Sequence, residues 1–259
     1  MPTQPKTNPA GVILGVTIIA ATLSLGAVFV LGMVMGSVTD TPHNAATVAT
    51  NHVPPPPASL SRSQLPSAVS HTVPFTAQAP LGNWVQPYQD ACEETSVIMA
   101  IAWASGIETL APQSVSDEID RIVAFENYEF GYNRDTAIRE TAKILTRFYG
   151  YPHVSMRYDI GVTDIKRELA SGRIVIAAAS GLVLRHPGYA KPPPYHMIVI
   201  TGYDDARQEF IAHDPGTRFG GNSRYAYDVL DEALHDWTGD YDTVLTEGRR
   251  AIIVVSRPE

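Results

Sequence analysis

The sequence predicts an α+β domain in which helices come first along the chain and most strands come later. Between residues 91 and 172, apolar side chains recur at helical spacing in four segments. Between residues 173 and 258, short runs rich in Val, Ile and Ala are typical of β-strands. Because one predicted helix interrupts these later runs, we expect most of their strands to pair antiparallel.

The N-terminal part predicts a short tail, residues 1–9, and a membrane-spanning helix, residues 10–36. No charged residue occurs from Thr7 to Thr39. A helix over residues 10–36 would extend about 40 Å, enough to cross a hydrocarbon core of about 30 Å. The apolar part of a cleaved signal peptide is shorter, about 7–15 residues. We therefore predict an uncleaved signal-anchor helix, with a cleaved signal peptide as the main alternative.

The charges that flank this segment predict its orientation. Lys6 and the terminal amine precede it, and Asp40 follows it. The positive-inside rule then places the tail in the cytoplasm and the C-terminal domain outside it. This predicts a single-pass protein of the cell membrane with an extracytoplasmic domain. Glycines four residues apart can mark a helix-dimer face, so weak dimerisation is possible through two such pairs: Gly11/Gly15 and Gly32/Gly36.

Residues 37–72 predict a linker, because they are rich in Ser, Thr, Ala and Pro and contain "PPPP" at 54–57. Such a stretch cannot bury a core, and its prolines favour an extended spacer. The soluble domain is then predicted over residues 73–259, which is long enough for one buried core. With a net charge of −8 and no Lys/Arg cluster, the chain lacks the basic footprint of a nucleic-acid-binding protein.

The elements of the domain follow from local patterns. Ser114 followed by Asp117 is typical of a capping box at a helix start, and glycines stand where helices end. Residues 72–80 favour a short strand or an extended segment. The predicted helices are 91–104, 114–126, 134–150, 161–172 and 227–237, and the predicted strands are 173–180, 195–205, 209–216 and 250–258.

Cys92 is the single cysteine of the chain, and it stands at the start of helix 91–104. At a helix start the backbone N–H groups and the helix dipole favour an anion, which lowers the pKa of a thiol. The carboxylates of Asp90, Glu93 and Glu94 oppose that shift, so a nucleophilic thiolate also needs a cationic partner. The alternative is a small buried apolar residue, the usual role of a free cysteine. A lone thiol outside the cytoplasm argues against this alternative.

His196 and Asp214 are the predicted partners of this cysteine. His196 opens the apolar strand "HMIVITGY", and Asp214 ends the next strand-like run, "IAHDPG". Two antiparallel strands joined by a turn at residues 204–205 would bring both side chains to one edge of the sheet. A nucleophilic cysteine needs such a base and a group that orients it. The alternatives are a strand-end histidine and a turn-forming aspartate without a catalytic role.

Three motifs resemble the papain-fold cysteine peptidases of the bacteriocin-leader-processing type, the peptidase family thirty-nine-like domain. They are "VPFTAQAPLGNWVQPYQDACEETSVIMAIAWASG", "YHMIVITGYDD" and "FIAHDPGT", between Val73 and Gly216. The resemblance implies that Cys92 is the nucleophile, that His196 is the general base and acid, and that Asp214 orients the imidazole. It also implies a papain-like fold, with a helical half and a half built on an antiparallel sheet.

Papain-like enzymes use a glutamine side chain in the oxyanion hole, together with the backbone N–H of the cysteine. We place Gln78 first and Gln86 next for this role, and Gln89 is a third candidate. Where many relatives have Gly after the cysteine, this chain has "C-E-E". Glu93 and Glu94 either solvate the helix N-terminus or shape the substrate cleft. The proline-rich insert 185–196 either borders that cleft or is a surface loop.

The predicted function is a membrane-anchored extracytoplasmic cysteine peptidase, a thiol hydrolase that cleaves peptide or peptidoglycan-type amide bonds. The expected partners are a peptide or cell-wall peptide substrate and a lipid bilayer at residues 10–36, with no nucleic acid. The same residues would also suit acyl transfer to an amine, and a catalytically inactive domain that binds peptide or wall polymer is a further alternative. The sequence has no motif for a metal or another cofactor, such as H-E-x-x-H or G-x-x-x-x-G-K-[ST].

Overall fold

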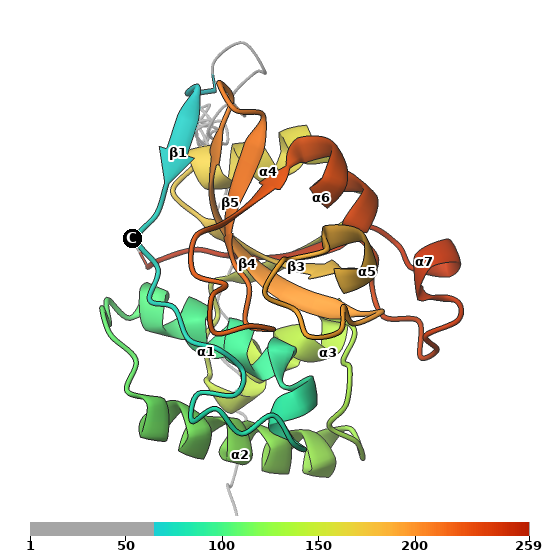
Figure 1. The fold of residues 1–259 in the computed structure, drawn as a ribbon. Coiled ribbons are helices and arrows are strands. Elements are labelled where there is room, and N and C mark those ends of the chain that lie inside the picture. Colours follow the sequence, from blue (N-terminus) through green and yellow to red (C-terminus); the bar gives the residue numbers. More distant parts are fainter. Residues whose placement is uncertain (1–64, 259) are drawn as a thin grey trace, which may run out of the picture. The chain divides into compact units, whose positions relative to one another are not determined.

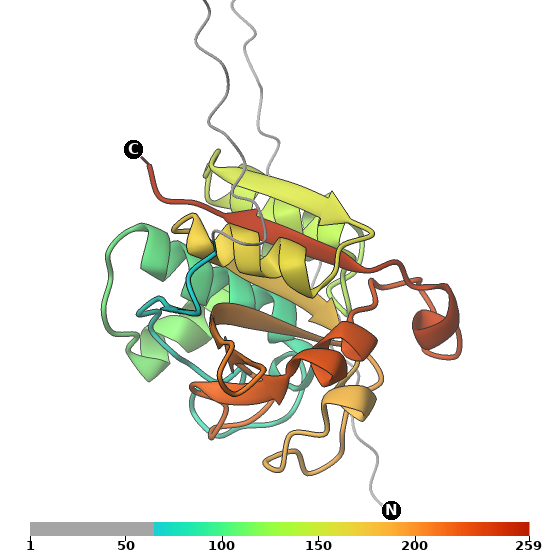
Figure 2. The same cartoon turned by 90° about the horizontal axis from the view of Figure 1, so that it is seen from above.

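An antiparallel sheet with helices on both faces makes up residues 65–258, the part of the chain that the computed structural model describes (Figure 1). The strand order is β2-β7-β3-β4-β5-β6, and β1 pairs with β4; Figure 2 shows this order with β2 in yellow and β7 in red. This confirms the predicted α+β class and its antiparallel sheet. The strands are β1 Ala68–Ser70, β2 Val154–Tyr158, β3 Ile174–Ala179, β4 His196–Asp204, β5 Glu209–His213, β6 Ser223–Ala226 and β7 Ala251–Val255.

The helices form two layers that cover the two faces of the sheet. One layer holds α1, α2 and α3, and the other holds α4, α5 and α6. Short turns of 3-10 helix (η2) and π-helix (η3) precede α1 and follow α3. The bounds are η2 Tyr88–Asp90, α1 Cys92–Ala104, α2 Pro112–Glu129, α3 Ile138–Lys143, η3 Ile144–Phe148, α4 Val162–Ala170, α5 Gly181–Leu184, α6 Tyr227–Ala233 and α7 Val244–Glu247.

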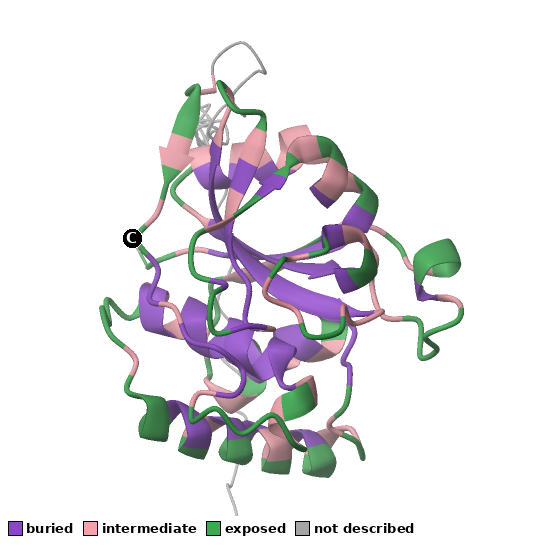
Figure 3. Ribbon diagram, viewed as in Figure 1, coloured by how far each residue is buried: buried purple, intermediate pink, exposed green. Residues whose placement is uncertain are grey.

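The central strands β3, β4 and β7 are buried on both faces, as Figure 3 shows in purple. Successive side chains of a strand point to opposite faces. Ile176 therefore packs in the core under α1, whereas Val175 packs in the core under α4. This rigid sheet fixes the strand ends that carry the candidate site.

Most of the predicted elements are confirmed near their predicted bounds. Helices 91–104 and 161–172 correspond to α1 and α4, and the four predicted strands correspond to β3, β4, β5 and β7. The two short strands β2 and β6 were not predicted. In β6, polar residues lie on both faces, and in β2 the alternation of apolar with polar residues extends over only five residues.

The folded unit begins before the predicted boundary at Val73. Ala68–Ser70 form β1, which pairs with the end of β4, so the predicted linker 37–72 reaches too far. Gly202 on β4 permits this pairing, because a Cβ there would lie 2.2 Å from the carbonyl oxygen of Val69. His71, which lies within the predicted linker, is half-buried, and its Nε2 lies 2.9 Å from the carbonyl oxygen of Leu169.

Two predicted helix starts are wrong. The second helix begins at Pro112 rather than Ser114, and no side chain caps it; proline suits a first helical position because its missing N–H needs no partner there. The third helix begins at Ile138 rather than residue 134, because the backbone of Asp135 is left-handed (φ 44°) and that of Ala137 is extended. The Ile138 N–H donates to Asp236 Oδ1 (2.8 Å). The segment before it thus runs along the cleft described below.

The predicted tail (1–9), the predicted membrane helix (10–36) and most of the predicted linker lie outside the described residues. Within residues 65–258, none of the helices combines the length and the apolar character needed to cross a lipid bilayer.

Candidate active site

Cys92 is the first residue of α1, and its side chain is 3% exposed. The helix starts there because the Ala91 carbonyl accepts the first helical hydrogen bond, from the Thr95 N–H (3.2 Å). Beyond this first turn, the apolar side chains of α1 pack against the sheet in the core. The nucleophile candidate is therefore held on a buried helix rather than on a loop.

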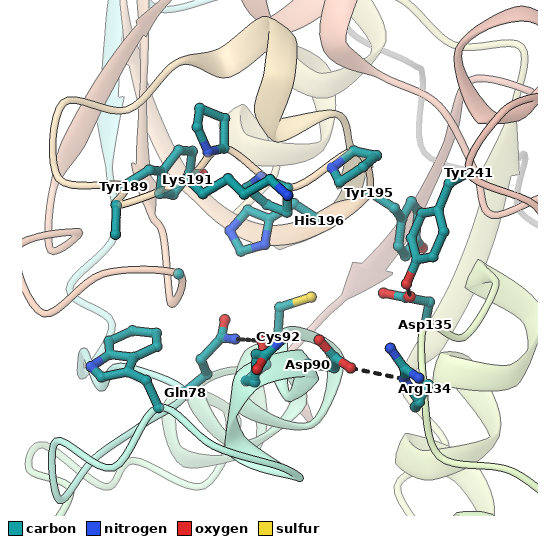
Figure 4. Close-up of a pocket in the computed structure, with 17 residues that line it drawn as sticks. Gln78, Asp90, Cys92, Arg134, Asp135, Tyr189, Lys191, Tyr195, His196 and Tyr241 are labelled. Carbon is teal, nitrogen blue, oxygen red and sulfur yellow. Dashed lines mark hydrogen bonds and ion pairs between the residues drawn. The ribbon is translucent and has the colours of Figure 1, made fainter.

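A cleft of about 560 Å³ lies over Cys92. Figure 4 shows Cys92, Gln78 and Asp90 on one wall and His196 with Tyr189 and Lys191 on the facing wall. The first wall belongs to the helical half of the domain, and the second belongs to the sheet and to the insert that precedes β4. The structure thus brings Cys92 and His196 into one cleft, although they are far apart in the sequence.

His196 and Asp214 meet at the edge of the sheet, as the antiparallel pairing of β4 with β5 predicts. His196 Nε2 lies 2.8 Å from Asp214 Oδ1, and both side chains are buried. Since Nε2 faces Asp214, the other ring nitrogen, Nδ1, is the one available to a thiol. The sequence prediction that these two residues share one edge is confirmed.

Three further donors hold the Asp214 carboxylate. The Gly216 N–H donates to Oδ1 (3.0 Å), and the hydroxyls of Tyr189 and Tyr225 both donate to Oδ2 (2.5 Å each). Burial by itself would raise the pKa of Asp214, but the charge of His196 and these hydrogen bonds outweigh it and lower the pKa to about 2. Asp214 is therefore a stable buried anion.

Tyr189 and Gly216 also fix the imidazole. The Tyr189 ring stands edge-on to His196, with ring centroids 5.7 Å apart and an interplanar angle of 86°. A Cβ on Gly216 would lie 2.9 Å from His196 Cε1 and 3.0 Å from Tyr189 Cε1. Glycine at this position is what allows the loop after β5 to pass against the ring.

The environment of the thiol differs from the one predicted. Cys92 Sγ donates a hydrogen bond to Glu93 Oε2 (3.0 Å). Burial raises the pKa of Cys92 well above its usual value, and the charges of Glu93, Asp135 and Glu94 raise it further. The predicted lowering by the helix N-terminus is outweighed, because desolvation and nearby carboxyls both disfavour the thiolate.

The two acidic residues after the cysteine neither solvate the helix nor line the cleft. Glu93 is 1% exposed and Glu94 is 2% exposed. Glu93 Oε1 accepts the Thr136 N–H (2.9 Å). Burial also raises the pKa of Glu126 on α2, to about 8, with a contribution from the charge of Glu93. The helical wall of the site is thus backed by a group of buried carboxyls.

The three candidate glutamines lie in different environments. Gln78 is buried in the cleft wall, and its Nε2 donates to the backbone carbonyls of Gln89 (2.7 Å) and Tyr88 (3.1 Å). Its Oε1 is buried and has no hydrogen-bond partner. Gln86 is exposed, and its amide donates to Asp90 Oδ2 (2.5 Å). Gln89 also lines the cleft.

Sequence reasoning missed several residues of the site. Tyr189 lies in the insert 185–196, which does border the cleft, but nothing in its spacing indicates a contact with Asp214. Tyr225 comes from the unpredicted strand β6. Asp135, whose Oδ2 accepts a hydrogen bond from Tyr241, was placed inside a predicted helix. These contacts join residues that are distant in the sequence.

An α+β fold in which a cysteine at a helix start shares a cleft with a buried His–Asp pair is the arrangement of a cysteine-peptidase-like protein. The chain belongs to the Peptidase_C39 like family, whose model matches residues 70–243. This confirms the resemblance stated from the three motifs.

The solved structures that are similar to this chain include the following two. One is from Bacillus anthracis and is described as a C39-like peptidase; it shares 14% identity and a TM-score of 0.48, over 74% of this chain and 99% of that one. The other is xylellain, a cysteine protease from Xylella fastidiosa, with 12% identity and a TM-score of 0.48 over 76% and 88% of the two chains. No curated protein matches the chain.

Proposed function

We propose that this protein is a cysteine peptidase in which Cys92 is the nucleophile, His196 the general base and acid, and Asp214 the residue that orients the imidazole. One observation carries the proposal. Cys92 and His196 line the same cleft. His196 Nε2 is hydrogen-bonded to Asp214 Oδ1 (2.8 Å), which leaves Nδ1 for Cys92. Membership of the Peptidase_C39 like family supports the same activity.

In the proposed reaction, His196 Nδ1 takes the proton of Cys92 as Sγ attacks the carbonyl carbon of the scissile amide. The tetrahedral intermediate collapses when His196 gives this proton to the leaving nitrogen, and an acyl-enzyme remains. Water, deprotonated by His196, then attacks the acyl carbon and releases the thiol. The buried Asp214 anion stabilises the imidazolium that forms in each half of the cycle.

The proposed oxyanion donors are the Cys92 N–H and the Gln78 side chain. The N–H of a first-turn residue has no acceptor within its own helix. Gln78 is better placed than Gln86, because it lines the cleft whereas Gln86 is directed at Asp90. If Gln78 Nε2 released its longer hydrogen bond, to the Tyr88 carbonyl (3.1 Å), that N–H could donate to the oxyanion instead.

We also propose that residues 10–36 anchor this domain to the outer face of the cell membrane and that its substrate is a peptide or a peptidoglycan-type peptide. The apolar segment and its flanking charges support the anchor. Protease added to intact cells should digest residues 73–259. If these residues are protected until the membrane is broken, the orientation is wrong.

Peptide hydrolysis tests the catalytic proposal. The full chain should cleave unstructured peptides, and Cys92→Ala should abolish the cleavage while leaving the protein folded. Addition of a nucleophilic amine separates hydrolysis from acyl transfer, since amide products would replace free acids. If Cys92→Ala cleaves as well as the unmodified protein, the proposal fails.

A further inference from the structure

Glu93, the residue after Cys92, is held rigidly against the sulfur. It is 1% exposed, and its two carboxyl oxygens have different partners. Oε1 accepts the N–H of Thr136 (2.9 Å), which comes from the segment before α3, and Oε2 accepts the hydrogen bond of Cys92 Sγ (3.0 Å). A backbone contact from another element therefore fixes the carboxyl in the position where it touches the reacting atom.

The surroundings of Glu93 offer it little positive charge. Glu94 on α1, Glu126 on α2 and Asp135 before α3 are the carboxyls that surround it, and Tyr195 faces it from the end of the insert 185–196. The cations Arg134 and Lys191 line the cleft together with Cys92, and Arg134 is already paired with Asp90 (2.9 Å). Within residues 65–258, neither Glu93 nor Glu94 takes part in an ion pair. A negative charge added at Cys92 would therefore lie beside carboxyls that have no cation of their own.

We propose that Glu93 is a catalytic-site residue that takes the hydrogen bond of the Cys92 thiol in the resting enzyme, so that Glu93 and His196 compete for the same proton. This inference rests on the proposed function of Cys92 and His196. The nucleophile is then stored as a neutral thiol bonded to Glu93. It becomes a thiolate only when the S–H rotates towards His196 and transfers its proton there. This transfer takes place when a substrate carbonyl is bound in position for attack by the sulfur.

The electrostatics support this assignment. Burial raises the pKa of Cys92, and Glu93 contributes both through its charge and through the hydrogen bond from the thiol. Burial, with the charges of Asp135 and Glu94, also raises the pKa of Glu93. Two negative charges separated by about 3 Å in a site with little solvent would repel each other strongly, so Cys92 and Glu93 are not both ionised. Since the thiolate is the reactive form of cysteine, this arrangement also protects the chain's single thiol from oxidation and alkylation while the cleft is empty.

Glu93→Gln tests the proposal directly. The glutamine keeps an oxygen for the Thr136 N–H but presents an N–H donor to the sulfur, which favours the thiolate. The rate of alkylation by iodoacetamide, in which a sulfur–carbon bond forms and iodide leaves, is measured against pH on the full chain. Cys92 is the only cysteine, so the reaction reports this thiol alone. We expect about tenfold faster alkylation at pH 7, equivalent to a thiol pKa about one unit lower.

Glu94→Gln is the matched control, because it neutralises a buried carboxyl on the same helix turn that does not bond the sulfur. We expect it to change the rate less than about threefold, since its charge raises the pKa of Cys92 less than the charges of Glu93 and Asp135 do. Equal acceleration by both variants, or no acceleration by Glu93→Gln, would overturn the role of Glu93.

The unmodified protein provides a test that does not depend on how a variant folds. Its alkylation profile should have a midpoint above about 8.5, the value for a free thiol, and a midpoint below it contradicts the proposal. His196→Ala separates this outcome from failure of the proposed function. If Glu93→Gln accelerates alkylation but His196→Ala leaves peptide cleavage intact, the peptidase mechanism is wrong and the contact with Glu93 stands.

Discussion

The two walls of the cleft have opposite effects on the pKa of their acidic groups. On the sheet wall, the Asp214 carboxylate accepts hydrogen bonds from His196, Gly216 and two tyrosines, and its pKa falls to about 2. On the helical wall, burial raises the pKa of Cys92, Glu93 and Glu94, and raises that of Glu126 to about 8. Both walls are buried, so burial itself is not the difference.

The difference lies in the number of donors that reach each carboxyl. Asp214 faces strand ends and loops, where N–H and O–H groups converge on it. Glu126 lies between packed helices whose backbone donors are already used, and the side chain that faces it is another carboxyl, Glu94. The sheet wall thus favours a charged carboxylate beside His196, whereas the helical wall favours a neutral Cys92 thiol.

After the loss of activity expected for Cys92→Ala, the largest effect should come from His196→Ala. General acid–base catalysis contributes about 10²- to 10⁴-fold, so we expect kcat/KM for a peptide to fall by that factor. His213→Ala is the control, because His213 is also a buried strand histidine but bonds the Val73 carbonyl (2.8 Å) instead of the cleft. Steady-state kinetics on both variants would contradict the assigned base if the two lost activity equally.

The helical wall should make the folded state less stable as the pH rises from about 4 to about 8. A carboxyl with a raised pKa, such as Glu126, binds its proton in the folded state while the unfolded chain has lost it, at a pKa of about 4.3. The expected loss in the free energy of unfolding is a few kcal/mol across this window. Urea unfolding against pH measures it, and Glu126→Gln should flatten the slope. If the slope is unchanged in Glu126→Gln, the pH dependence of stability comes from other groups.

The sheet wall should respond to pH in the opposite direction and at lower values. The pKa of Asp214 is lowered to about 2 in the folded state, against about 3.9 in an unfolded chain. Asp214 therefore adds about 2–3 kcal/mol to the free energy of unfolding above about pH 4, and this stabilisation is lost as the pH falls towards 2. Acid unfolding of the protein and of Asp214→Asn measures it. The variant should not show this loss of stability at low pH. If the loss is unchanged in the variant, it does not come from Asp214.

We expect the smallest effects from removing the hydroxyl of either tyrosine that bonds Asp214. Tyr189→Phe and Tyr225→Phe each remove one hydroxyl from Asp214 Oδ2, and each should lower stability by about 1–3 kcal/mol, as for a hydrogen bond to a charged group. Tyr189 also lines the cleft and contacts His196. We therefore expect Tyr189→Phe to shift the pH profile of kcat more than Tyr225→Phe does, and equal shifts would show that the contact with the ring has no role.

The sequence alone determined the α+β class, the helix that begins at Cys92 and the meeting of His196 with Asp214. Each depends on a local pattern: helical spacing marks α1, and the antiparallel pairing of two consecutive strands brings the start of β4 beside the end of β5. The motifs around these residues also indicated the family.

Only the tertiary structure decided the electrostatics of the site. The hydrogen bond from Thr136 to Glu93 joins residues 43 positions apart, and that from Tyr189 to Asp214 joins residues 25 positions apart. No periodicity records such contacts, since they depend on how helices and loops pack over the sheet. From the sequence, the two glutamates after the cysteine could either solvate the helix start or shape the cleft. Packing against α2 and the segment before α3 instead buries both, and their charges raise the pKa of the thiol.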